Sequence, residues 1–211
     1  MPMNYAAQAS ATPTSGTTVV VSKPAGTIDG DVLVAMVSIR ASSPSITPPS
    51  GWTLVGSVAG TSSGTVTGVW TRVASSEPAS YTWTSSNTIT DAVGLILRYT
   101  PAAPTTAPGS VDATAQGSLV SPAVAPSVNA TGNNDRLICL FSTGSTVGST
   151  PSGMTQRAAI DNGLSGAWAY DELLTAIGAT GTRTWTGSGS GVGWTVALLG
   201  NQQGSRIRMM I

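Results

Sequence analysis

Short apolar runs alternate with turn-forming residues from about position 17 to position 200 of this 211-residue chain. Residues 31–39 are apolar at nearly every position, which is typical of a central strand that is covered on both faces. Residues 81–84 alternate aromatic and hydroxyl side chains, so that both rings lie on one face of a strand. The same reading predicts further strands at residues 18–21, 52–55, 65–73, 93–99, 135–141, 166–170, 182–186 and 192–199.

Helix signals are almost absent from the pattern. Residues 171–177 are the one candidate for a helix, and seven residues without packing partners make a marginal helix. About 10–12 short strands that are separated by Gly and Pro turns predict an all-β fold. We expect an antiparallel β-sandwich or jelly roll.

The two parts of the chain share a weak internal repeat with an offset of about one hundred residues. The matches keep their order, which favours a duplication over the chance reuse of turn chemistry. Residues 17–100 would form the first β half and residues 125–200 the second, joined by a Pro/Ser-rich connector at 101–124. The halves would form the two sheets of one sandwich or two tandem sandwiches. The matched segments are 30–33 with 134–137, 49–53 with 151–155, Trp70 with Trp168, 81–84 with 183–186, and 93–94 with 192–193.

Both ends of the chain differ in composition from the strands. Residues 1–16 are rich in Ala, Ser, Thr and Pro, so we expect an extended arm that gains order only on another subunit. Residues 201–211 change from polar to apolar, which predicts a tail that joins a neighbour's sheet edge or fills its hydrophobic groove. The candidates for subunit contacts are Met1, Pro2, Met3, Asn4, Tyr5, Arg206, Ile207, Arg208, Met209, Met210 and Ile211.

The composition argues against several kinds of site. The chain has no histidine, so it cannot build a Ser-His-Asp triad, a Cys-His pair or a histidine-based zinc site. Charged residues make up 9% of the chain and the formal net charge is zero, which leaves no basic face for nucleic acid. We therefore expect no enzymatic activity, no cofactor and no nucleic-acid partner.

A surface of Ser, Thr and Gly has little electrostatic repulsion to keep copies of the protein apart. Two interpretations fit this composition equally: a neutral module of the extracellular type, and a subunit that sits among neighbours.

Three carboxylates are candidates for a glycosidase pair: Asp171, Glu172 and Glu77. Adjacent residues of a strand point to opposite faces, so Asp171 and Glu172 cannot face each other across a sugar. Residues 29–31 have part of the pattern of a calcium loop but lack its further oxygen ligands, which favours a turn ahead of a strand.

The tryptophans divide into a core set and one candidate platform. Trp83, Trp185 and Trp194 alternate with or adjoin aliphatic residues, so core packing is expected for them. Trp52 follows a Pro-Ser-Gly turn and is the candidate for a partly exposed ring that stacks on a glycan. Cys139 lies in an apolar run, where a buried and inert thiol is expected, and a single cysteine cannot form an intrachain disulfide.

The first residues have neither the basic nor the apolar region of a signal peptide. No apolar stretch approaches the roughly 18 residues that a membrane helix needs. We therefore expect synthesis in the cytoplasm and no membrane partner.

Several turn and core motifs resemble β-sandwich proteins encoded in the structural regions of tailed bacteriophages and prophages. They are Lys23-Pro-Ala-Gly, Pro48-Pro-Ser-Gly-Trp-Thr-Leu-Val55, Trp70-Thr-Arg-Val-Ala, Glu77-Pro-Ala-Ser-Tyr-Thr-Trp83, Ala125-Pro-Ser-Val, Gly153-Met-Thr-Gln-Arg157 and Gly178-Ala-Thr-Gly-Thr-Arg183. The resemblance covers residues 17–200 and includes no active residue.

This resemblance implies a virion protein, made in the host cytoplasm, that forms homo-oligomers and contacts the major capsid protein or other virion proteins. We expect a capsid decoration or cement protein in which the arm and the tail act as straps. The alternatives are a tail-fibre or tail-tip adhesin, or a carbohydrate-binding module, that uses exposed aromatic rings on glycans.

Overall fold

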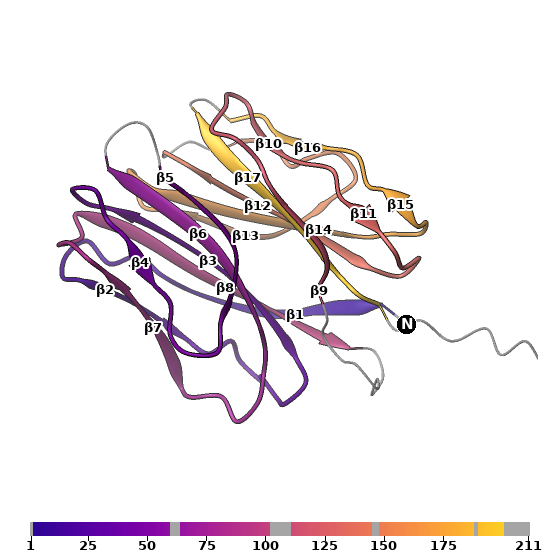
Figure 1. Ribbon diagram of the computed structural model, residues 1–211, viewed down its shortest axis with the longest axis horizontal. Helices are drawn as coiled ribbons and strands as arrows, with labels where there is room; N and C mark the ends of the chain where they lie inside the picture. The colour runs from indigo at the N-terminus through magenta and orange to yellow at the C-terminus, as the bar shows by residue number, and fades with distance from the viewer. Residues whose placement is uncertain (1, 60–63, 102–110, 145–147, 188–189, 201–211) are drawn as a thin grey trace, which may run out of the picture.

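Every strand that the sequence pattern predicts is present in the computed structural model, which describes residues 2–59, 64–101, 111–144, 148–187 and 190–200. All the strand pairs are antiparallel, and these residues contain no helix. Two five-stranded sheets lie face to face, and smaller sheets cover their outer faces (Figure 1).

The first large sheet has the strand order β1 (Met3–Ala11), β8 (Asp91–Pro101), β3 (Val32–Arg40), β6 (Thr65–Val73) and β5 (Thr53–Ala59). The second has the order β13 (Thr155–Asp161), β14 (Gly166–Leu173), β12 (Arg136–Thr143), β17 (Gly191–Leu198) and β9 (Val111–Gln116). The small sheet next to the first contains β2 (Thr18–Ser22), β7 (Ser80–Ser85) and β4 (Ile46–Thr47). Those next to the second are the pairs β10 (Ala123–Ala125) with β16 (Arg183–Trp185), and β11 (Asn129–Ala130) with β15 (Gly178–Ala179).

Covering on both faces explains the continuous apolar run of β3. Its even-numbered apolar residues, such as Val34 and Met36, belong to the core between the two large sheets. Its odd-numbered residues, such as Leu33 and Val37, pack against Trp83 and the small sheet outside. Because neither face meets water, every position from Val32 to Ile39 is apolar or, at Ser38, hydrogen-bonded.

The two large sheets repeat one strand order. If each sheet is read from the strand that comes first in the chain, β9-β17-β12-β14-β13 follows the same scheme as β1-β8-β3-β6-β5. The sheets stack in opposite senses, so that β1 contacts β13 and β5 contacts β9. The edge strand that comes first in each half of the chain, β1 or β9, therefore does not contact its counterpart in the other half. It contacts the other edge strand of the opposite sheet, β13 or β5.

Asp31 and Asp135 show the same repeat in local detail, since each lies just before the central strand of its sheet. The Asp31 carboxylate accepts the N–H of Ile28 at 2.9 Å, and the Asp135 carboxylate accepts the N–H of Gly132 at 3.0 Å. Their backbone carbonyls accept the N–H groups of Ala74 and Leu174 at 2.8 and 2.9 Å. Each aspartate thereby fixes the turn that leads into β3 or β12, as expected for Asp31.

The expectation of a separate arm at residues 1–16 is wrong for residues 3–11, which form β1 and pair with β8 of the same chain. A register shift between Tyr5 and Ala7 directs Met3 and Tyr5 to the core between the sheets, and Ala9 and Ala11 to the outer core. Strand β1 forms without large apolar side chains because its backbone hydrogen bonds to β8 hold it in the sheet.

The helix candidate at residues 171–177 is also wrong. Residues 171–173 are the end of β14, which pairs with β12 on one side and with β13 on the other. Pairing on both sides outweighs the weak helical tendency of a seven-residue segment. In addition, β9 lies inside the segment that was expected to be only a connector.

Candidate functional site

Trp52 is not the exposed platform that the sequence suggests. Its side chain is 8% exposed, and its ring packs against Tyr81 and Trp83 at centroid distances of 5.1 and 5.3 Å. A ring enclosed by other rings cannot stack on a glycan, so this assignment is corrected. The core positions expected for Trp83, Trp185, Trp194 and Cys139 are confirmed, because all four are fully buried.

The three candidate carboxylates lie apart and are each engaged within the fold. Asp171 lies in the core between the sheets, while Glu172 points outward and forms an ion pair with Arg183. Glu77 accepts hydrogen bonds from Arg72 at 2.6 Å and from Tyr81 at 2.8 Å. The opposite orientation expected for Asp171 and Glu172 is confirmed, and the three groups do not converge on a common cleft.

The N-terminal contact candidates have mixed environments. Met3 is 2% exposed and belongs to the chain's own core, so its side chain is not available to a neighbour. Pro2 and Tyr5 are partly buried, and Asn4 is exposed. Met1 and the tail candidates at residues 206–211 lie outside the described residues.

A buried ionic cluster joins the two large sheets at the end where β1 begins. The Asp171 carboxylate, which is fully buried, accepts a hydrogen bond from Arg157 Nε at 2.8 Å and lies 3.8 Å from Arg136 Nη1. Its second oxygen accepts the Tyr99 hydroxyl at 3.1 Å. Burial, followed by the charge of Asp171, raises the pKa of Tyr99 well above its usual value, so this phenol stays protonated.

Strand β1 is tied into the same cluster. Arg136 Nε donates to the Met3 carbonyl at 2.9 Å, and the Arg157 guanidinium lies over the Tyr5 ring at 4.8 Å. The N-terminal strand therefore contacts the second sheet through charged and aromatic groups. These contacts link the first large sheet to the second.

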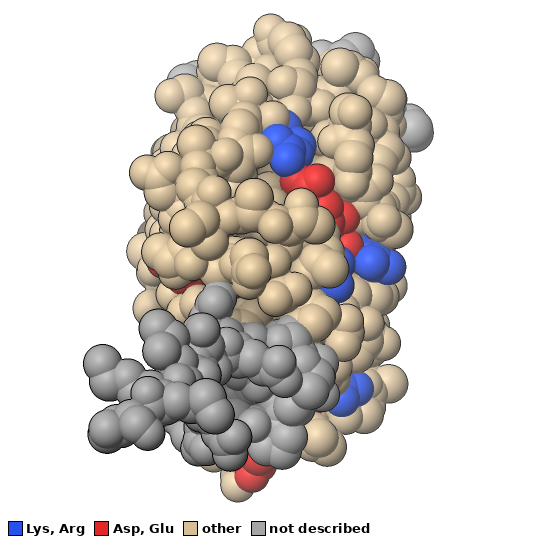
Figure 2. All heavy atoms as spheres, turned by 90° about the vertical axis from the view of Figure 1, so that its right-hand side faces the viewer, with Lys and Arg blue, Asp and Glu red and all other residues tan. Residues whose placement is uncertain are grey.

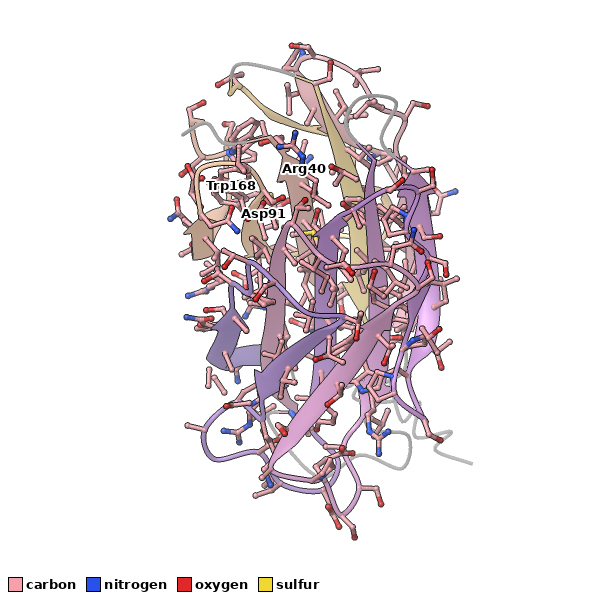
Figure 3. All side chains as sticks on the ribbon, turned by 90° about the vertical axis from the view of Figure 1, so that its left-hand side faces the viewer. Arg40, Asp91 and Trp168 are labelled. Atoms are coloured by element: carbon pink, nitrogen blue, oxygen red, sulfur yellow. The ribbon has the colours of Figure 1, made fainter. Side chains whose placement is uncertain are left out.

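A pocket of about 210 Å³ opens between the sheets at their other end, where Arg40 closes β3. In cross-strand register Arg40 lies opposite Thr65 on β6 and opposite Asp91 on β8; Arg40 and Asp91 are labelled in Figure 3. The pocket is lined by Arg40, Val58, Thr65, Thr67, Leu119, Ser142, Thr143, Gly144, Leu164, Ser165, Ser190 and Val192.

Hydroxyl groups form the inner part of this pocket. Thr67 Oγ1 donates to Ser38 Oγ at 2.9 Å and lies 3.0 Å from Ser142 Oγ, so these three hydroxyls join the two sheets. Ser165 also lines the pocket and is 2% exposed, and its Oγ has no hydrogen-bond partner in the described part of the chain. Sequence reasoning missed this site, whose one signal is a lone arginine at the end of an apolar strand.

Two acidic residues, Asp112 on β9 and Asp135 just before β12, interact with each other. Burial, together with the nearby carboxyl of Asp112, raises the pKa of Asp135 to about 6, although the N–H groups of Gly200 and Gly132 act to lower it. Asp112 in turn accepts the backbone N–H and the hydroxyl of Thr131, each at 2.6 Å. Desolvation and a like charge act in the same direction on Asp135.

Arginine charge is mostly neutralised within the fold. Of the six arginines in the described part of the chain, five take part in ion pairs with Asp or Glu: Arg72, Arg98, Arg136, Arg157 and Arg183. Arg40 is the exception. Figure 2 shows one face on which the charged side chains form a narrow line and other residues make up most of the described surface.

Within the described ranges, no group of three or more His, Cys, Asp or Glu side chains is placed to hold a metal ion. The same residues include no helix that is long and apolar enough to span a membrane. No family model, curated protein or solved structure matches this chain. Its function therefore has to be inferred from its own residues and their geometry.

Proposed function

We propose that this chain is a non-enzymatic structural protein of a bacteriophage virion, where it decorates or cements the capsid. The observation that carries the proposal is the internal use of charge: five of the six described arginines are paired with Asp or Glu of the same chain. Because these charges are paired with each other, the protein surface is close to neutral. Such a surface lacks the electrostatic repulsion that keeps soluble proteins apart. Such a surface suits a subunit that is packed among neighbours.

The outer three-stranded sheet supports this interpretation. Its solvent-facing positions are occupied by Thr, Ser and a single Val, with no charged residue. A flat neutral face can lie against another protein without the desolvation cost of buried ions. These positions are Thr18, Val20, Ser22, Thr47, Ser80, Thr82 and Thr84.

The edges of the large sheets supply a second kind of contact. Among the described strands, β1, β5, β13 and β9 are each paired on one side only. An edge strand can extend its sheet by pairing with a strand of another chain, and polar groups of the backbone then provide the affinity. Many such contacts among fixed subunits add up through effective concentration.

We also propose that the two large sheets form one β-sandwich that arose by internal duplication. The repeated strand order and the matched contacts of Asp31 and Asp135 support this. The alternative of two tandem sandwiches is less favoured, because residues of both large sheets share one core.

An edge-strand variant tests the assembly role. Gln8→Lys and Ser10→Lys place charge at exposed positions of β1 while its buried face is unchanged. We expect the double variant to fold and to lose attachment to particles in a reconstitution assay, because lysine on an edge opposes pairing. Ser152→Lys, at an exposed turn, is the matched control and should attach normally. If the double variant attaches as well as the unmodified chain and the Ser152→Lys control, this edge has no role in attachment.

A tail-fibre or tail-tip adhesin, or a carbohydrate-binding module, is the second candidate. The pocket beside Arg40 favours it, whereas buried Trp52 does not. An adhesin would be present in few copies per particle and would bind glycan as an isolated protein.

A further inference from the structure

We infer that the pocket beside Arg40 binds the carboxylate of a sugar acid, such as one hexuronate unit of a polysaccharide. This inference does not depend on where the protein sits in a particle, because a capsid protein and an adhesin could both carry the site. It follows from three properties of the pocket: a cation without an ion-pair partner among the described residues, a lining of hydroxyls of which one is buried and without a partner there, and apolar walls of limited size.

The cation is the first property. Arg40 is partly exposed at the pocket and makes no ion pair with any described residue, in contrast to the other five described arginines. Asp91 is its neighbour in the sheet, yet the Asp91 carboxylate is 2% exposed and accepts the Asn162 amide through Oδ1. Among the described residues the Arg40 guanidinium therefore has no ion-pair partner, and its paired N–H donors match the two oxygens of a carboxylate.

The hydroxyl groups are the second property. Ser165 Oγ is buried and has no partner among the residues that the structure describes, although buried polar groups are nearly always hydrogen-bonded. Thr65, Thr143 and Ser190 add further hydroxyls to the lining. A hydroxyl both donates and accepts, so this lining complements the ring hydroxyls of a sugar.

The walls and the size are the third property. Val58, Leu119, Leu164 and Val192 present apolar surface that suits the C–H face of a sugar ring. At about 210 Å³ the pocket is smaller than the roughly 300–1,000 Å³ of sites for drug-sized ligands, which suits a single sugar unit. Leu164 is 55% exposed, so a polysaccharide chain could continue past it into solvent.

NMR titration of the full-length chain with D-glucuronate tests the inference. We expect shifts at Arg40, Ser165 and Val192 and a Kd on the order of 1 mM, since a single charge-assisted contact dominates. D-glucose, which lacks the carboxylate, should bind at least about tenfold more weakly. Acetate, which lacks the ring, should also bind more weakly than glucuronate. Equal binding of glucose would overturn the role of the charge, and equal binding of acetate would overturn recognition of the sugar.

Two variants locate the site. Arg40→Gln should weaken glucuronate binding at least about tenfold, and Ser165→Ala should weaken it severalfold. Thr114→Val, in a separate pocket between β5 and β9, is the control and should leave binding unchanged. Shifts elsewhere on the protein, or unchanged affinity in Arg40→Gln, would overturn the assignment. Neither outcome changes the expected number of copies per particle. The carboxylate site can therefore be disproved without disproving the capsid role, and the capsid role without disproving the site.

Discussion

Replacing Asp171 by Asn tests whether the ionic cluster between the large sheets stabilises the fold. The substitution keeps the shape of the side chain and removes its charge. It leaves Arg157 and Arg136 without their shared counter-ion, although their side chains are only 26% and 12% exposed. Breaking a buried ion pair costs about 3–5 kcal/mol. Since both guanidinium groups retain some access to water, we expect a loss near the lower value, about 3 kcal/mol.

The chain supplies a matched control one residue away. Glu172 pairs with Arg183 on the outer face of the same strand, where both side chains are partly exposed. Such pairs contribute about 0–1 kcal/mol, so Glu172→Gln should change the free energy of unfolding by less than about 1 kcal/mol. Both variants alter a carboxylate on β14 in the same way, and they differ only in the face that the residue occupies.

Urea unfolding followed by tryptophan fluorescence measures both values, with equal m-values as evidence that the denatured states match. Tyr99→Phe should cost about 1–2 kcal/mol in the native background, because it leaves one Asp171 oxygen unpaired. It should cost less in the Asp171→Asn background, since the charged acceptor is gone. If Asp171→Asn is no more destabilising than Glu172→Gln, the cluster does not hold the sheets together and this reasoning is refuted.

Three further predictions concern other parts of the fold. The raised pKa of Asp135 means that the folded state holds its proton more tightly than the unfolded state, so this carboxyl should lower stability as the pH rises from about 4 to about 6. The lowered pKa of Asp112 acts in the opposite direction, and Asp135→Asn should remove the fall in thermal unfolding curves. A methyl group at Gly193 would meet the backbone of β10 at 2.5 Å, whereas at Gly94 it would meet valine methyls at 2.6 Å and at Gly144 nothing within 4 Å. Alanine should therefore destabilise most at Gly193, by about 1–3 kcal/mol or more, less at Gly94 and hardly at all at Gly144; any other order in chemical denaturation would contradict the packing. Burial raises the pKa of Cys139 to about 12, so the native protein should resist a thiol reagent that labels it readily in urea, and rapid native labelling would show that the strand opens.

Most strands of the two large sheets could be predicted because their patterns are strong, whereas the edge strands β9 and β13, which contain few large apolar residues, were missed. The continuous apolar run of β3 and the alternating rings of β7 predict both the strands and the side chains that are buried. Strand β1 could not be predicted, since its Ala, Ser and Gln residues carry no apolar signal. Its order comes from backbone pairing with β8, a partner some ninety residues away in the chain.

The candidate site was harder to predict for a related reason. Trp52 looked accessible because it follows a turn, but that turn folds its ring onto Tyr81 and Trp83. Arg40 carried no motif at all. It becomes a candidate only when the structure shows that the other described arginines are paired and that Ser165, far away in sequence, lines the same pocket.

The number of copies per particle tests the central proposal most directly. Quantitative gel analysis of virus particles purified from cells that express this chain would give its ratio to the major capsid protein. A decoration or cement protein should be present at a fixed ratio close to that of the capsid subunits. A handful of copies per particle, or none, would contradict the capsid role.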